Sequence, residues 1–485
     1  MSFLRLPREL RDMMYEQYYA VENGYIYDAE HNKLTQADDG SPISLSLSLT
    51  CRQVASEVQG LAFRLNTITF TTSCSRRTQK AAAIFHATVG GITRRKQVMI
   101  RSLVSQLLTR DMVELAAKAY PQFAPVFNGW VPQTDIPILY KKDFYCGEAP
   151  SVWVEFTHHV LDLMSKHPLF VSKASAIPRI WGPDGNCRAT QLNDASPKPW
   201  LIPDPTELER LASIFNVKAT LPHYKPGTKY TYSAASTAIY FLRMLPNTLR
   251  SEIQNITLLE DRESVAYAKC HGRGFIEFCQ SNPKLRVKCV VSLWQNALPV
   301  SPEMRTKYML ASQYPDLDYD LSRDRLLPKF ISKALGSWMA EMMALPSLGM
   351  PDGSYRLVLD GEPTGDHTSD VFKAVQRDIA WQSALDEAYS RGLLPTPSWL
   401  ERRLRVGYLY EGLPDIVGTM SDPQSLITCN FDPGSPLVVA DMLKERRTWT
   451  PLEWAENWDT HEPGEYQTEA PMAQWHTLRY QRIFG

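Results

Sequence analysis

The chain has 485 residues, of which 44% are hydrophobic and 22% are charged, and its formal net charge is −1. This length and composition are typical of a globular protein with a sizeable core. The near-zero net charge excludes a general attraction to nucleic acids or anionic membranes. No apolar run approaches the ~20 residues that span a bilayer, and residues 1–30 lack the apolar core of a signal peptide.

Eight cysteines are spread thinly along the chain. Without a secretory signal, this spacing predicts free thiols in a reducing compartment and therefore an intracellular protein, cytoplasmic or nuclear. The sequence has no phosphate-binding glycine loop, no H-E-x-x-H motif and no C-x-x-C motif. These absences weigh against an enzyme, and we expect no catalytic residue, no metal ligand and no cofactor.

The first predicted element is a helix over residues 3–20. Pro7 suits the first helical turn because its missing N–H has no helical partner there, and Glu9 suits the positive end of the helix dipole. Apolar side chains then recur at three- and four-residue spacing and form one stripe: Leu10, Met13, Met14 and Tyr18. Residues 22–44 are polar and rich in turn-forming residues, which predicts a loop.

A second helix is predicted to begin at Thr50. Thr50 with Gln53 three residues later has the spacing of a capping box. We expect this helix to end at Asn66. Residues 67–72 alternate Ile68 and Phe70 with threonines, which predicts a half-buried strand.

Further along, amphipathic and alternating patterns predict more helices and strands. The helices are 103–119, 234–245, 266–280, 329–345 and 369–391, and the strands are 253–259, 285–294 and 355–359. Helix followed by strand occurs three times. This order predicts a mixed α/β fold, in which an N-terminal helical segment leads into irregular helix–strand layers or a degenerate solenoid.

The composition divides the chain into four regions. Residues 1–75 form the N-terminal segment, 76–232 an irregular and mostly helical connection, and 233–392 the layered helix–strand region. Residues 393–485 are rich in tryptophan and acidic residues. We expect Trp454 and Trp458 to share a helix face and to be buried in the packing of this region.

Carboxylates gather between the predicted strand 355–359 and the helix that follows: Asp360, Glu362, Asp366 and Asp370, together with His367. Carboxylates at the end of a strand are typical of α/β active sites, so an enzyme centred on residues 360–370 is one alternative. No nucleophile or glycine loop accompanies them in the sequence. We therefore expect a structural role, with Asp366 and Asp370 capping the helix.

The charges are unevenly distributed. Residues 58–110 contain nine basic and no acidic residues, whereas residues 451–471 contain six acidic and no basic residues. A phosphate or nucleic-acid binder acting through 58–110 is therefore a second alternative. We favour the simpler hypothesis that the two stretches neutralise each other inside the fold.

The N-terminal segment resembles a known family. Residues 4–19, LRLPRELRDMMYEQYY, and residues 47–70, LSLTCRQVASEVQGLAFRLNTITF, are similar to uncharacterised fungal F-box-like proteins. In that group a Leu-Pro-x-Glu-Leu-Arg helix precedes a Thr-Cys-Arg-Gln helix and an Asn-x-Ile-x-Phe strand. The long stretch 22–46 between the two helices departs from the compact F-box pattern.

The resemblance implies a protein-interaction adaptor, a substrate-recognition subunit of a cullin-type ubiquitin ligase. Its first helix would contact the linker subunit of the ligase, through the partner-binding residues Leu6, Pro7, Leu10, Met13, Met14 and Tyr18. The other protein partner is unknown, and neither nucleic acid nor membrane is expected. If the stripe forms part of the core instead, these residues should be buried.

Overall fold

One seven-stranded sheet organises the computed structural model, which describes residues 3–75, 77–130, 145–177, 180–181, 186–214, 229–300, 326–458 and 466–479. The strand order is β2-β1-β3-β4-β5-β6-β7. The β1–β2 pair is antiparallel and every other pair is parallel. The predicted mixed α/β class is confirmed.

The strands are β1 (Tyr25–Asp28), β2 (Lys33–Gln36), β3 (Thr67–Thr71), β4 (Asn255–Glu260), β5 (Arg286–Ser292), β6 (Tyr355–Asp360) and β7 (Ile427–Cys429). The four predicted strands correspond to β3 to β6. The prediction of a loop over 22–44 was wrong, because β1 and β2 form a short hairpin there. Tyr25 and Tyr27 of β1 are buried, which accounts for the strand despite its polar surroundings.

Helices cover one face of the sheet. Phe241 of α10 (Ala234–Met244) packs on Phe70 and Tyr27, with ring centroids 5.5 and 5.1 Å apart. Further along, Tyr355 of β6 packs against Phe275 at the end of the 3-10 helix η5 (Ala268–Phe275), at 5.8 Å. The helices α12 (Ile276–Ser281) and α14 (Pro328–Ala344) complete this layer.

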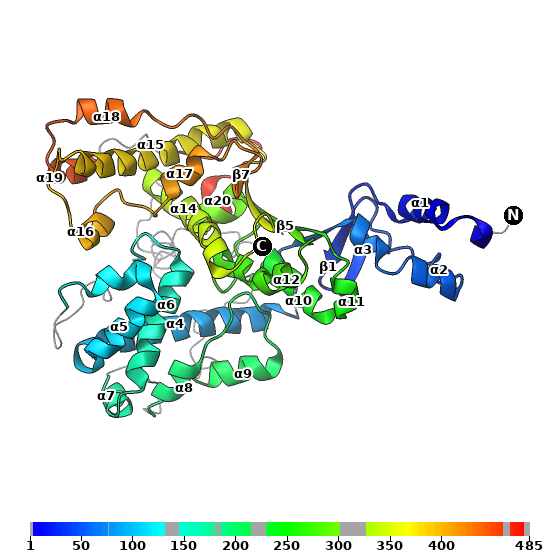
Figure 1. Cartoon of the computed structure of the whole chain (residues 1–485), viewed down its shortest axis with the longest axis horizontal. Coiled ribbons are helices and arrows are strands. Elements are labelled where there is room, and N and C mark those ends of the chain that lie inside the picture. The colour runs from blue at the N-terminus through cyan, green and yellow to red at the C-terminus, as the bar shows by residue number, and fades with distance from the viewer. Residues whose placement is uncertain are drawn as a thin grey trace, which may run out of the picture.

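A helical region connects β3 to β4. It comprises α4 (Gln79–Leu107), α5 (Arg110–Ala119), α6 (Pro150–Ser165), α7 (Phe170–Ser175), α8 (Ala189–Asp194) and α9 (Pro205–Ser213), and it lies in the lower half of Figure 1. The single helix predicted over 103–119 was wrong. The backbone is extended at Leu108, and the Thr109 side chain then caps α5 by accepting a hydrogen bond from the Met112 amide. The predicted solenoid is not confirmed, because a solenoid needs repeats of similar length and the segments that connect successive strands differ greatly in length.

In the described part of the C-terminal region, five further helices follow α15 (Gly365–Ser390). They are α16 (Trp399–Leu404), α17 (Leu413–Gly418), α18 (Val439–Glu445), α19 (Pro451–Glu456) and α20 (Trp475–Arg479) (Figure 1). Trp454 and Trp458 both pack on Trp381 of α15, at 5.1 and 5.5 Å, so their predicted burial is confirmed. The shared helix face was wrong, because α19 ends at Glu456 and Trp458 follows it. No helix in the described ranges is long and apolar enough to cross a membrane.

Candidate functional site

The N-terminal helix α1 (Arg8–Tyr19) projects from one end of the molecule with α2 (Arg52–Glu57) and α3 (Leu61–Leu65) (Figure 1). Its inward face is formed by Arg11, Tyr15 and Tyr19, which follow one another at four-residue spacing. Tyr15 and Tyr19 share a small core with side chains from α2 and α3: Val54, Val58 and Leu61. This core fixes the rotation of α1 about its axis.

The predicted apolar stripe lies on the outward face. The exposed fractions are 46% for Leu10, 66% for Met13, 50% for Met14 and 46% for Tyr18. Pro7 is exposed and caps α1 rather than lying within its first turn, and Leu6 is half-buried. The alternative that the stripe is core was therefore wrong, because the opposite face of the helix is the one that packs.

An ion-pair network holds α1 in this orientation. The Arg11 guanidinium donates to both carboxylate oxygens of Glu57 in α2, at 3.0 and 2.6 Å. The Tyr15 hydroxyl donates to the same carboxylate at 2.7 Å. These hydrogen bonds from Arg11 and Tyr15 lower the pKa of Glu57 to about 2. Sequence analysis missed Glu57, because nothing in its local pattern shows that it meets a residue 46 positions away.

The lowered pKa of Glu57 predicts acid sensitivity of this segment. The carboxylate contributes stability above its ordinary pKa of 4.5, and the contribution is lost as the pH falls toward 2. We expect Glu57→Gln to lower the melting temperature at pH 6, and the difference from wild type to shrink as the pH falls from 5 to 3. Melting curves of both proteins across this range test the prediction, and a difference that does not change with pH would contradict it.

The exposed stripe continues onto the chain before α2. The Tyr18 hydroxyl lies 2.6 Å from Ser44 Oγ, and the following Leu45 and Leu49 are 58% and 81% exposed. The Ser-Leu alternation over 44–49 was the available sequence signal for these residues. We call the whole set the N-terminal apolar surface: Leu10, Met13, Met14, Tyr18, Leu45 and Leu49. Of the nineteen exposed large apolar side chains in the described ranges, eight lie within residues 3–49, a concentration typical of an interaction surface.

The helix predicted to begin at Thr50 differs from the observed one. Its cap is Cys51, whose Sγ accepts a hydrogen bond from the Val54 amide at 3.5 Å, so the predicted Thr50–Gln53 capping box was wrong. The helix is also interrupted by Gly60, which has a φ of +73° and packs against the Glu252 side chain. Only glycine adopts this backbone conformation there without strain and without displacing Glu252.

Asn66 joins the N-terminal segment to the sheet. Its side-chain amide donates to the carbonyls of Tyr19 and Ala62, both at 2.8 Å, and its oxygen accepts from the Val21 amide at 2.8 Å. One buried side chain thus connects the end of α1, the end of α3 and the start of β3. The N-terminal apolar surface is therefore presented on a fixed support.

The carboxylates of residues 360–370 do not converge. Asp360 accepts from the Asn430 amide at 2.7 Å, and Asp370 pairs with Lys373 at 2.6 Å. His367 stacks on Trp294 with ring centroids 5.3 Å apart. The predicted capping by Asp366 and Asp370 was wrong, since Thr364 is the cap residue of α15. Across the described ranges no three His, Cys, Asp or Glu side chains are grouped so that they could hold a metal.

The basic stretch 58–110 does not form one surface. Lys96 is buried and donates to the Asn193 carbonyl at 2.9 Å, while Arg95 donates to the Ile180 carbonyl at 3.0 Å. No ion pair between described residues joins this stretch to 451–471, and α4 lies far from α19 (Figure 1). The predicted neutralisation of one stretch by the other is therefore wrong for the described residues. The dispersal of the cations also weighs against the phosphate-binding alternative.

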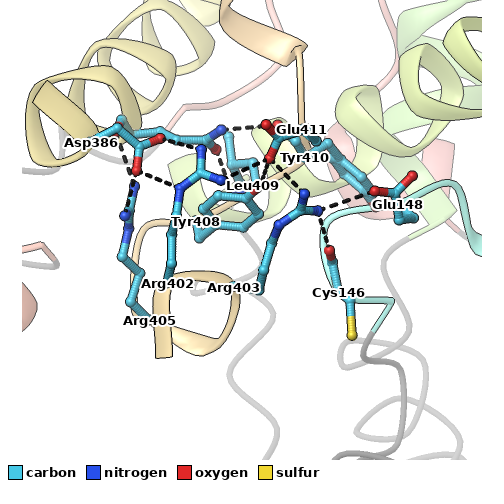
Figure 2. Close-up of polar contacts among 11 residues, drawn as sticks. Cys146, Glu148, Asp386, Arg402, Arg403, Arg405, Tyr408, Leu409, Tyr410 and Glu411 are labelled. Carbon is cyan, nitrogen blue, oxygen red and sulfur yellow. Dashed lines mark hydrogen bonds and ion pairs between the residues drawn. The ribbon is translucent and has the colours of Figure 1, made fainter. Parts of the chain in front are cut away.

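The densest polar cluster belongs to the C-terminal region. Figure 2 shows three arginines from α16 and its end, Arg402, Arg403 and Arg405, beside Asp386, Glu411 and Glu148. Arg402 donates hydrogen bonds to both carboxylate oxygens of Asp386, at 2.9 and 3.0 Å, and Arg405 donates to the same carboxylate at 2.7 Å. Burial alone would raise the pKa of Asp386, but the hydrogen bonds and charges of Arg402 and Arg405 together outweigh it and hold this pKa below its usual value.

This cluster acts as a structural clasp. Arg403 pairs with Glu148 at 3.2 Å and with Glu411 at 2.9 Å, and it also donates to the Cys146 carbonyl (Figure 2). Three cations thus face three carboxylates, which leaves no net charge to attract a ligand. We name the six charged residues the arginine clasp: Glu148, Asp386, Arg402, Arg403, Arg405 and Glu411.

A small, largely apolar cavity of about 20 Å³ lies between the sheet and the helices α14 and η5. Its lining includes the titratable residues Glu260, Lys269, Cys289, Glu341 and Tyr355. The volume suffices for a single water molecule and for nothing larger. The cavity is therefore too small for an organic substrate.

Comparison of the chain with protein-family models, curated proteins and solved structures found no match.

Proposed function

We propose that the chain is a protein-interaction adaptor that docks onto a partner through the N-terminal apolar surface. The observation that carries the proposal is the orientation of α1, in which the polar residue Arg11 faces inward and the apolar stripe faces solvent. A protein that only needed a stable helix would bury the stripe, because burial of each Leu or Met contributes about 1.5–3 kcal/mol. An exposed stripe on a fixed support is suited to a partner that supplies the missing burial.

The resemblance of residues 4–19 and 47–70 to F-box-like proteins suggests which partner this is. We infer that it is the linker subunit of a cullin-type ubiquitin ligase, in which case the rest of the chain would recruit a substrate. The stripe residues that the resemblance implies for docking are the ones that the fold leaves in solvent: Leu10, Met13, Met14 and Tyr18. Exposure of this stripe is required by the proposal, and it supports the proposal without identifying the partner.

The test is a binding measurement with purified full-length chain and the linker subunit of a fungal cullin-type ligase. We expect Leu10→Asp to weaken binding roughly ten- to hundredfold, the factor that corresponds to losing burial of one such side chain. The melting temperature should not change, because Leu10 contributes little to the N-terminal core.

The matched control is Leu115→Asp. Leu115 is 54% exposed on α5, outside the N-terminal segment, and its substitution should change neither binding nor melting temperature. Wild-type chain that fails to bind the linker subunit would refute the ligase assignment. A Leu10→Asp variant that unfolds would refute the assignment of the stripe to docking.

A further inference from the structure

The sheet carries a second surface that the proposed docking helix does not use. Along β3 to β6 alternate side chains are buried beneath α10, η5 and α14, as Phe70 and Tyr355 are. The intervening side chains point to the opposite face, and those of Thr69, Thr257 and Lys288 are half-buried or exposed. Parallel sheets are normally covered on both faces. A face that no helix of the described ranges covers therefore indicates a surface for a partner.

The strand register aligns the side chains of this face into rows, and two adjacent rows form the candidate surface. One row runs across the sheet through Ile26, Thr69, Thr257, Lys288 and Arg356. The next row runs through Thr71, Leu259, Val290, Val358 and Thr428. A further row toward the strand ends contains Ser292 and Asp360, whose carboxylate accepts a hydrogen bond from Asn430. We call the ten residues of the first two rows, with Arg286 at the start of β5, the open face. It combines a polar and basic row with an aliphatic row.

The cations of the open face have no carboxylate partner among the described residues. Lys288 is exposed and makes no hydrogen bond or ion pair with any described residue. Arg356 donates to the Pro423 carbonyl at 2.9 Å and to Gln424 Oε1 at 3.0 Å, and Arg286 donates only to backbone carbonyls of the preceding residues. The arginine clasp, by contrast, neutralises each of its cations. The open face thus keeps positive charge available.

The side chains of the open face favour an acidic protein segment over a nucleic acid as the ligand. It contains no aromatic side chain on which a base could stack, which disfavours single-stranded nucleic acid. Aliphatic side chains beside cations without a carboxylate partner are complementary to a peptide segment in which acidic and aliphatic residues alternate. We propose that the open face binds an extended acidic segment of a partner protein, with its carboxylates on Lys288, Arg356 and Arg286.

The experiment selects ligands from a random twelve-residue peptide library displayed on phage, with the full-length chain as target. We expect the enriched peptides to be acidic and to contain aliphatic residues. Binding of the strongest peptide is then measured by fluorescence anisotropy with wild type and with Lys288→Glu/Arg356→Glu. We expect the double variant to bind at least roughly tenfold more weakly, and wild-type binding to weaken at high salt.

Three controls make the result decisive. Lys288→Gln removes one charge at an exposed site and should weaken binding without affecting folding, and Lys173→Glu, on the distant α7, should bind as wild type does. Linker-subunit binding should be unaffected by the open-face variants, so this proposal and the docking proposal can fail separately. Enrichment of neutral or basic peptides, or of none, would overturn the proposal. So would a labelled single-stranded oligonucleotide that binds wild type and is released by the double variant.

Discussion

Asp386→Ala is expected to lower the free energy of unfolding of the C-terminal region by about 3 kcal/mol. Asp386 is the common acceptor of Arg402 and Arg405, and the side chain of Arg405 is only 9% exposed. Removal of one partner from a partly buried ion pair leaves an undercompensated charge, which costs more than the pair itself contributes. Among the described residues Arg402 then keeps only Glu411 as an acceptor, at 3.3 Å, and Arg405 keeps only the Gln382 carbonyl, at 3.0 Å.

Tryptophan fluorescence during urea unfolding would measure this effect. Trp381, Trp449, Trp454 and Trp458 cluster around α15, the helix that carries Asp386, so their emission reports on this region. Asp370→Ala is the matched control on the same helix. Its ion pair with Lys373 is largely solvent-exposed, so we expect no measurable change. An equal response of the two variants would show that the arginine clasp is not a source of stability.

The central strands and their helices were predictable because their buried residues recur at regular spacing within a short stretch of sequence. Ile68 and Phe70 alternate with threonines in β3, and the apolar stripe of α14 has helical spacing. Such local patterns determine most of an element's type. The short hairpin of β1 and β2 has no comparable pattern, since each strand has four residues and β1 depends on pairing with β3.

The candidate surfaces were predictable only in part. Periodicity identified the stripe of Leu10, Met13, Met14 and Tyr18, but it could not determine whether this face of α1 is buried. That outcome depends on Glu57, which neutralises Arg11 and so allows a charged face to pack inward. The open face was beyond sequence analysis, because Lys288 and Arg356 become neighbours only through the register of β5 and β6.

The second large effect is expected at Glu260, which lines the small cavity and is 1% exposed. One oxygen accepts a hydrogen bond from the Ala235 amide at 2.9 Å, and the other has no hydrogen-bond partner among the described residues. Burial disfavours the charged form and raises the pKa of Glu260 from 4.5 to about 7. The folded chain therefore holds a proton on Glu260 at pH values where the unfolded chain releases it.

This difference makes the stability of the wild type depend on pH in a defined direction. Below pH 4.5 Glu260 is protonated in both states, and its contribution to folding is fully present. As the pH rises through 7 that contribution is lost, so the free energy of unfolding falls by about 3 kcal/mol from this group. Glu260→Gln is neutral at every pH and keeps an oxygen to accept from Ala235, so it should not show this fall.

The stability of Glu260→Gln relative to wild type should therefore increase by about 3 kcal/mol between pH 4.5 and 7. Other titrating groups near the cavity, such as Lys269 and Glu341, are present in both proteins and largely cancel in the comparison. Urea unfolding of both proteins at several pH values gives the difference directly. If it stays constant across this range, Glu260 remains charged in the folded chain, and a cation or hydrogen-bond donor must then compensate its buried oxygen.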